Sequence, residues 1–135
     1  MESLNISLSD VDVLARTVWG EARGESYEGK CAVAHVILNR WRAAKGRKTI
    51  EAVCQEPWQF SCWNAHDPNR AKLLAVTLDD PMFRACWRAA LDAFDAPDAT
   101  KGARHYCTID IDPAWAHGHE PIVIIGRHQF FVGIN

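Results

Sequence analysis

Apolar residues in the first part of the chain recur with the period of an α-helix. Val11, Leu14 and Val18 share one face of a helix that we expect to end near Gly24. Ser9 has the hydroxyl group of a helix N-cap, and an aspartate follows three residues later, as in a capping box. The pattern therefore predicts an amphipathic helix that begins just after position 9.

Four further helices are predicted downstream, one of them a short helix after Pro68. Ser26 should cap a helix from position 27 to about 44, and Thr49 should cap a short helix that ends before Pro57. Pro81 should lie in the first turn of a helix with a stronger apolar pattern. The second helix has the apolar stripe Val33, Ala34, Ile37, Leu38 and Trp41. The inward face of the last should carry Phe83, Trp87, Ala90, Leu91 and Phe94.

The last third of the chain changes to short β-type runs. Residues 104–109, 121–125 and 128–132 are predicted strands, and Gly126-Arg127 is the expected two-residue turn of a hairpin. The fold class predicted is therefore α+β, mostly helical with a small antiparallel sheet near the C-terminus. A length of 135 residues suits one domain, residues 1–135.

Composition and charge narrow the partners. The formal net charge of −2 argues against nucleic acid, which usually requires a basic face. No apolar run reaches the roughly 18 residues of a membrane-spanning helix, so no stable membrane insertion is expected. The first residues lack the features of a signal peptide, which predicts a chain that is cytoplasmic as synthesised. The five cysteines include no CxxC pair, which favours reduced thiols.

Glu21 places a carboxyl group on the apolar face of the first predicted helix, three residues after Val18 and seven after Leu14. A carboxyl group taken partly out of water holds its proton more tightly, which suits a general acid near neutral pH. The alternative is a frayed helix end with two solvated carboxylates, Glu21 and Glu25. The adjoining glycines favour a functional role, because they let a ligand or backbone approach closely.

The segment from 57 to 70 has no clear period and is rich in aromatic residues. Aromatic rings stack on the apolar faces of sugars, and amide and hydroxyl groups fix their orientation. Alternatively, the aromatic side chains fill the core. The candidate substrate-binding residues of this segment are Trp58, Gln59, Phe60, Ser61 and Trp63.

Histidines gather near the C-terminus, which raises the alternative of a zinc site in a peptidoglycan amidase or peptidase. Its ligands would be His105, His117 and His119 or Cys107. The spacing matches no zinc signature and no HExxH is present, so we expect neither a metal nor another cofactor.

The chain resembles the SleB-like cell wall hydrolase family, which includes spore cortex-lytic enzymes and phage endolysins. The strongest part of the resemblance is Gly-Glu-Ala-Arg-Gly-Glu at positions 20–25, and it extends over about residues 10–132. Further matching stretches are 15–29, 32–40, 49–53, 59–63, 102–106 and 125–128. Arg127 is a departure, because members often have Asn there.

The resemblance implies a lysozyme-like fold that cleaves the β-1,4 bond between N-acetylmuramic acid (MurNAc) and N-acetylglucosamine (GlcNAc) in peptidoglycan. It makes Glu21 the catalytic acid and Glu25 the second motif glutamate, which we expect to bind substrate. Ser61 and Tyr106 match positions that face the glycan, and His105 is placed beside them as a substrate-binding candidate.

The reaction type has two alternatives. Hydrolytic glycosidases use two carboxyl groups, and the possible partners Asp67, Asp79 and Asp80 lie in capping or loop contexts. A lytic transglycosylase needs one acid, because the 6-hydroxyl of muramic acid attacks its own anomeric carbon; the resemblance favours this route. A non-catalytic carbohydrate-binding module is a further alternative. The expected setting is a monomeric phage endolysin that reaches the periplasmic cell wall after holin-type release.

Overall fold

The computed structural model describes residues 6–57 and 59–134. Its helices are α1 (Leu8–Ala22), α2 (Tyr27–Ala43), α3 (Ile50–Cys54), α4 (Pro68–Ala75) and α5 (Pro81–Ala93). Its strands are β1 (His105–Thr108), β2 (Val123–Ile125) and β3 (His128–Phe131), with short 3-10 turns η2 (Ser61–Trp63) and η3 (Ala114–Ala116). This confirms the α+β class with a small antiparallel sheet near the C-terminus.

The helix starts follow the predicted caps with one exception. Ser26, Thr49 and Asp80 cap α2, α3 and α5 through their side chains. The cap of α1 is Ser7, so the prediction of Ser9 was wrong. The Ser7 hydroxyl accepts from the Asp10 amide and the Asp10 carboxylate accepts from the Ser7 amide, which closes the capping box two residues earlier.

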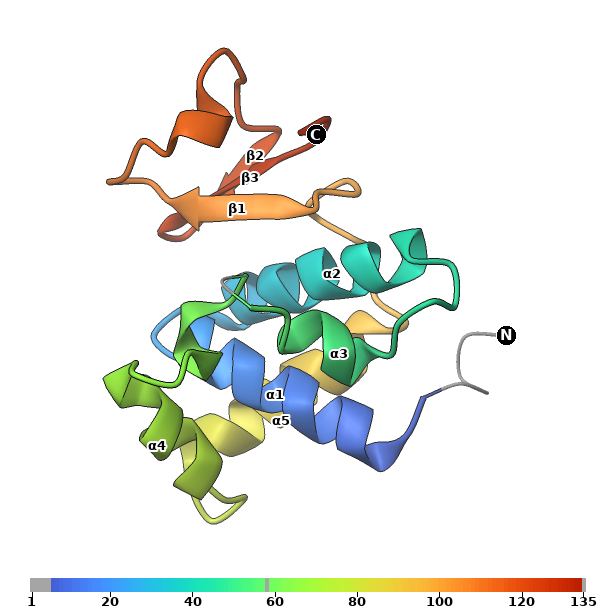
Figure 1. Cartoon of the computed structure of the whole chain (residues 1–135), viewed down its shortest axis with the longest axis vertical. Helices are drawn as coiled ribbons and strands as arrows, with labels where there is room; N and C mark the ends of the chain where they lie inside the picture. Colours follow the sequence, from blue (N-terminus) through green and yellow to red (C-terminus); the bar gives the residue numbers. More distant parts are fainter. Residues whose placement is uncertain (1–5, 58, 135) are drawn as a thin grey trace.

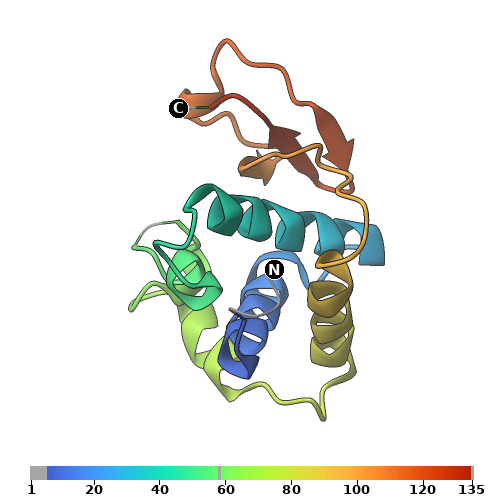
Figure 2. The same cartoon turned by 90° about the vertical axis from the view of Figure 1, so that its right-hand side faces the viewer.

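Helix α2 lies between two layers of the molecule. Figures 1 and 2 show the three-stranded sheet on one side of α2 and the remaining helices on the other. Its side chains accordingly are buried on both sides: Val33 and Ile37 pack in the main helical core, and Val36 packs with Phe130 of the sheet. A helix with two buried faces fits the nearly continuous apolar sequence of this segment.

The sheet has the strand order β1-β3-β2, with both pairs antiparallel. Tyr106 of β1 lies opposite Phe130 of β3, and Ile125 of β2 lies opposite His128 across the hairpin turn. The turn is Gly126-Arg127, as predicted, and Gly126 has a φ of +60°. The sheet thus brings Tyr106 and His128 onto neighbouring strands, and the Tyr106 hydroxyl reaches the last turn of α1.

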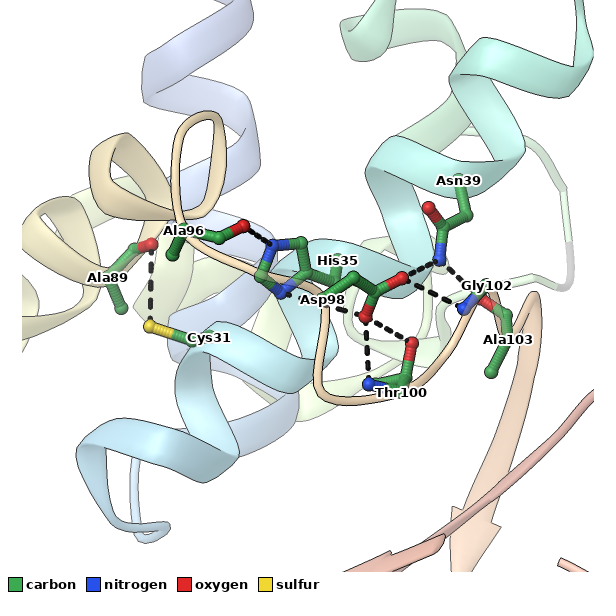
Figure 3. A network of polar contacts seen from close by, with 9 residues as sticks. All are labelled: Cys31, His35, Asn39, Ala89, Ala96, Asp98, Thr100, Gly102 and Ala103. Atoms are coloured by element: carbon green, nitrogen blue, oxygen red, sulfur yellow. Dashed lines mark hydrogen bonds and ion pairs between the residues drawn. The ribbon is translucent and has the colours of Figure 1, made fainter. Parts of the chain in front are cut away.

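A polar network fixes the loop between α5 and β1 (Figure 3). The carboxylate of Asp98 accepts hydrogen bonds from the side chain of Asn39, from the amide and hydroxyl of Thr100, and from the amide of Gly102. These donors lower the pKa of Asp98 against the opposing effect of burial. Asn39 also donates to the carbonyl oxygen of Ala103, so the path into β1 is tied directly to α2.

One inward position of α5 was predicted wrongly. Leu91 is 49% exposed, whereas its helix neighbours Phe83 and Ala90 are buried. The buried stripe of α5 continues through the small residues Ala89 and Ala93 instead, because close packing against α1 and α2 requires short side chains there.

The five cysteines are free thiols, and each is buried. Burial raises the pKa of Cys54 to about 12 and that of Cys86 to about 11. Within residues 6–57 and 59–134, no helix has both the length and the apolar character needed to cross a bilayer.

Candidate functional site

Glu21 lies in the last turn of α1, where the helix meets the first strand of the sheet. The Tyr106 hydroxyl donates a hydrogen bond of 2.6 Å to Glu21 Oε1. Three residues before Glu21 on the same helix face, Val18 is fully buried in the core. The amphipathic pattern therefore carries this carboxyl group to the boundary between the core and the surface.

The surroundings of Glu21 raise its pKa above the usual value of a glutamate. Loss of hydration is the largest cause, and the negative charge of Asp67 adds to it. Hydrogen bonds from Tyr106 and from the side chain and backbone of Cys62 act in the opposite direction, but they are the smaller effect. A glutamate with this balance keeps its proton to higher pH, as a general acid requires.

Glu21 opens into a cleft of about 380 Å³ between the helical layer and the sheet. The cleft walls come from α1, α2, the η2 segment, β1, the loop after β1 and the start of β3. Its lining residues are Gly20, Glu21, Arg40, Gln59, Ser61, Tyr106, Cys107, Thr108, Ile111, Pro113, Trp115 and His128. The volume falls in the range of small-ligand sites.

Close packing at Gly20 keeps the wall beside Glu21 free of a side chain. A Cβ at Gly20 would lie 2.7 Å from both Cβ and Sγ of Cys62. Glycine at this position therefore allows η2 to approach α1, which places the backbone and thiol of Cys62 next to the Glu21 carboxyl group. Gly20, the motif glycine before Glu21, thus lets Cys62 pack close to the Glu21 carboxyl group.

Arg40 crosses the wall of the cleft and joins three segments. Its Nε donates to the Arg104 carbonyl oxygen at 2.7 Å and its Nη1 to Gln59 Oε1 at 2.9 Å. Its guanidinium group lies 5.0 Å from the centre of the Phe60 ring. Burial lowers the pKa of Arg40, while Tyr106, Glu56 and Glu21 raise it. Arg40 thus holds the loop containing Gln59 against the start of β1.

The structure brings together part of the predicted set. Gln59, Ser61 and Tyr106 line the cleft with Glu21. Phe60 is 1% exposed and packs in the core, so its ring offers almost no surface to a sugar. Trp63 packs against the core and donates from Nε1 to the Thr17 hydroxyl.

Two aromatic candidates remain, Trp58 and His105. Trp58 falls outside the described residues. His105 is not in the cleft wall; its ring lies 5.3 Å from that of Trp115. Burial, together with the charges of Arg40 and Arg104, lowers the pKa of His105, which keeps it neutral near pH 7. His105 therefore supports the ring of Trp115, which does line the cleft.

Glu25 lies beneath the hairpin turn rather than in the cleft. Its side chain is 9% exposed, and Oε1 accepts the Arg127 amide at 2.9 Å. His128 Nδ1, which is buried and has no hydrogen-bond partner among the described residues, is 3.7 Å from the same oxygen. Burial is the main cause that lowers the pKa of His128, and the proximity of Glu25 acts against it. The second motif glutamate thus anchors the turn before β3.

Sequence reasoning did not place several residues of the cleft, among them Trp115, Arg40 and His128. Trp115 lies in η3, a segment without a periodic pattern, and only its isolated tryptophan in a polar loop could have drawn attention. Arg40 was visible only as one more basic residue of α2. His128 was seen in the last strand, but its approach to Tyr106, with ring centres 5.0 Å apart, depends on the pairing of β1 with β3.

The alternative ligand sets do not come together. Among the described residues that line the cleft, Glu21 is the only carboxylic acid. Asp67 and Asp80 cap α4 and α5. Across residues 6–57 and 59–134, no group of three or more His, Cys, Asp or Glu side chains is placed to hold a metal ion. His117 Nε2 instead lies 3.2 Å from Asp112 Oδ2, in the exposed part of the loop after β1.

Comparison with known proteins gives a consistent match over most of the chain. The profile of a family described as Cell Wall Hydrolase matches residues 24–131. The spore cortex-lytic enzyme of Bacillus subtilis (strain 168) is 32% identical over 129 residues, which cover 92% of this chain and 38% of that protein. The spore cortex-lytic enzyme of Halalkalibacterium halodurans is 34% identical over 123 residues, which cover 90% of this chain and 34% of that protein. The chain thus spans only about a third to two-fifths of the length of these curated relatives.

Two solved structures share the fold over nearly their whole length. The catalytic domain of the Bacillus cereus SleB protein has a TM-score of 0.76 at 32% identity and covers 93% of this chain and 91% of that one. The catalytic domain of the germination-specific lytic transglycosylase SleB from Bacillus anthracis has a TM-score of 0.74 at 32% identity, with coverage of 93% and 95%.

Proposed function

This chain belongs to the SleB-like cell wall hydrolase family, and we propose that it cleaves the MurNAc–GlcNAc β-1,4 bond of peptidoglycan as a lytic transglycosylase, with Glu21 as the proton donor. The family predicted from the sequence is confirmed by these matches. The observation that carries the proposal is the single carboxyl group among the described cleft residues, whose pKa is raised mainly by burial.

The proposed reaction uses one acid twice. Protonated Glu21 gives its proton to the oxygen that bridges C1 of muramic acid and C4 of the next sugar, and the C1–O bond breaks. The 6-hydroxyl of the same muramic acid then bonds to C1, and the Glu21 carboxylate takes its proton. The products are a 1,6-anhydro end and a free 4-hydroxyl, and Glu21 has regained its starting protonation state.

Tyr106 would hold the Glu21 carboxyl group in a fixed orientation through its 2.6 Å hydrogen bond. Burial and the neighbouring Glu21 raise the pKa of Tyr106 well above its usual value, so its hydroxyl remains a donor at all working pH values. Ser61, Gln59 and Trp115 are the cleft residues whose hydroxyl, amide and ring suit contacts with a sugar.

Hydrolysis with a second carboxylate is the competing reaction. It needs a second acidic group about 5–9.5 Å from the first to act on the sugar or on a water. No such group lines the cleft among the described residues, which favours the route that takes its nucleophile from the substrate. The two routes differ by one water in the mass of the products.

The test is product analysis on purified sacculi with wild type and Glu21→Gln. We expect wild type to release fragments with 1,6-anhydro ends, and Glu21→Gln to lose at least about a hundredfold in rate, as for removal of a general acid. Glu28→Gln, an exposed glutamate in the first turn of α2, is the matched control and should retain activity. Activity of Glu21→Gln above a tenth of wild type would remove Glu21 from this role, and reducing ends would indicate hydrolysis.

Two other functions expected as alternatives give different outcomes in the same assay. A zinc amidase would release peptides rather than glycan fragments and would lose activity with a chelator. A carbohydrate-binding module would retain sacculi without releasing product, and Glu21→Gln would not change that retention.

The biological setting is a further part of the proposal. We propose that residues 1–135 form one catalytic domain that acts as a monomer on cell wall peptidoglycan. The relatives described above are spore cortex-lytic enzymes of bacteria, so they support a cell wall or spore cortex substrate. The phage endolysin with holin-type release stays a prediction from the sequence, which lysis by co-expression with and without a holin would test.

A further inference from the structure

A second pocket adjoins the cleft and has an unusual charge. It encloses about 430 Å³ and shares Arg40 with the cleft. Four of its lining side chains are basic, Arg40, Arg47, Lys48 and Arg104, and one is acidic, Glu56. We call it the basic pocket. Its net charge of +3 contrasts with the net charge of −2 of the whole chain.

Most of this positive charge has no ion-pair partner within the described protein, although the charges of Glu56 and Glu21 reach Arg40. Lys48 Nζ lies 2.7 Å from Glu56 Oε1, which accounts for the one acid of the pocket. The side chain of Arg40 donates hydrogen bonds to the carbonyl oxygen of Arg104 and to the amide oxygen of Gln59. The side chain of Arg47 donates to the carbonyl oxygen of Ala44. Among residues 6–57 and 59–134, no carboxylate forms an ion pair with Arg40, Arg47 or Arg104.

Helix stability explains only part of this arrangement. Basic residues at the C-terminal end of a helix interact favourably with its dipole, and Arg40 and Arg42 lie in the last turn of α2. Arg104 comes from a different segment, immediately before β1, and the Arg40 bond to its carbonyl oxygen fixes it beside the helix end. Guanidinium groups gathered from two segments repel one another, so a bound anion would stabilise them.

The position of the basic pocket identifies the anion class. Unmodified N-acetylated glycan is uncharged along its length, whereas the peptide stems on its muramic acid residues carry free carboxylates. An anion site that shares a wall residue with a glycan cleft is therefore placed to receive these stems. We propose that the basic pocket binds the carboxylates of a peptidoglycan stem peptide while the glycan lies in the cleft. This inference rests on the proposed function.

The first test compares two substrates that differ at the stem carboxylates: teichoic-acid-free sacculi, and the same sacculi with these carboxylates converted to uncharged methylamides. Wild type should act roughly tenfold faster on the native sacculi, the effect of one or two charge-assisted hydrogen bonds. The double variant Arg47→Gln/Arg104→Gln should cleave the native and the methylamide sacculi at equal rates. That rate should match the rate of wild type on the methylamide sacculi. The matched control is Arg88→Gln, an exposed arginine of α5 that should keep the wild-type preference. Equal rates of wild type on the two substrates would overturn the proposal, as would an unchanged preference in the double variant.

The second test measures binding without catalysis. A soluble stem tetrapeptide is titrated into wild type while the arginine side-chain NMR signals are followed. We expect saturable shifts of Arg47 and Arg104 that weaken with salt, and no saturable shift of the remaining arginine signals in the double variant. Binding of poly(glycerol phosphate) without binding of the tetrapeptide would overturn the proposal in favour of a phosphate polymer.

If the tetrapeptide binds but sacculi are not cleaved, the proposed function fails while the basic pocket stands. If sacculi are cleaved without a charge preference, the proposed function stands and the basic pocket has no role in binding stems.

Discussion

At the scale of single residues, two opposing influences set the proton affinity of Glu21. Burial favours the neutral acid, and the hydrogen bonds from Tyr106 and Cys62 favour the carboxylate. The proposed reaction needs both forms in turn, first as a donor and then as an acceptor. A carboxyl group that is buried but still hydrogen-bonded is suited to both, because neither form is strongly disfavoured.

Removal of the Tyr106 hydroxyl should shift the pH dependence of the reaction. Tyr106→Phe deletes a hydrogen bond that lowers the pKa of Glu21, so that pKa should rise further. Activity that requires protonated Glu21 is lost as pH rises through this pKa, so the alkaline limb of the kcat/KM profile should move to higher pH. The measurement is the pH profile of fragment release from sacculi.

Tyr27→Phe is the control for this shift, because Tyr27 donates to Asp92 and does not line the cleft. It should leave the alkaline limb in place. A limb that stays fixed in Tyr106→Phe, or moves to lower pH, would show that the hydroxyl does not tune Glu21.

Sequence reasoning located Glu21 but could not assign its neighbours. The helical period alone puts Glu21 on the face of Leu14 and Val18, and these are local relations. Whether Phe60 or Trp115 meets the cleft depends on tertiary packing, and both are aromatic residues in segments without a period. The structure puts Phe60 in the core under Arg40 and Trp115 on the cleft wall.

At the scale of secondary-structure elements, the β2–β3 hairpin is joined to the α1–α2 connection through Glu25. The Arg127 amide donates to the Glu25 carboxylate, and a side chain at Gly126 would push against that carboxylate. A Cβ at Gly126 would lie 2.3 Å from Glu25 Oε1. The contact with Glu25 therefore helps to fix the turn before β3, and the strand itself is also held by its pairing with β1 and by the buried Phe130.

Gly126→Ala should loosen this junction. The substitution combines a positive φ with a clash, and we expect a loss of about 2–4 kcal/mol in the free energy of unfolding together with reduced activity. Gly46→Ala is the matched control, since Gly46 has a φ of +83° but nothing within 4 Å of an added Cβ. It should cost only about 1 kcal/mol. Equal losses in the two variants, measured by urea unfolding, would show that the contact with Glu25 contributes nothing.

The elements themselves were largely predictable from local pattern, and the errors have local reasons. Caps and prolines indicated the starts of α2, α3 and α5, because one side chain satisfies the first amides. Ser9 was predicted as the cap of α1 with an aspartate three residues later, but Ser7 has the same spacing to Asp10, and the structure closes the box there. Leu91 was placed inward because the apolar period includes it, although its side chain is half exposed in the folded protein.

At the scale of the whole molecule, the carboxyl group of Glu21 is expected to lower stability. Because the pKa of Glu21 is raised on folding, the folded state binds its proton more tightly than the unfolded state does. The stability of wild type should therefore fall as pH rises from the ordinary glutamate value of 4.5 through the raised pKa of the folded protein. Above that pKa the full cost of burying the carboxylate is present.

Glu21→Gln removes this titration and keeps an oxygen that accepts from Tyr106. We expect the variant to be more stable than wild type by about 1 kcal/mol at pH 8, the usual size of such a gain, and by little at pH 4. The measurement is urea unfolding at both pH values, with Glu28→Gln as the exposed control. A variant less stable than wild type at pH 8 would mean that the folded protein favours the carboxylate.

The distribution of the buried thiols gives the molecule its own reporters of motion. Cys31, Cys54, Cys62 and Cys86 belong to the helical layer, whereas Cys107 belongs to β1. The thiolate is the form that reacts with an alkylating reagent, and burial both disfavours it and keeps the reagent out. A buried thiol therefore reacts only when its surroundings open. Cys107 packs with Ala116, Phe131 and Ile134, in a cluster separate from the one that joins the sheet to α2. Alkylation of Cys107 ahead of the other four would therefore reveal opening of the segment around η3, whose Trp115 lines the cleft.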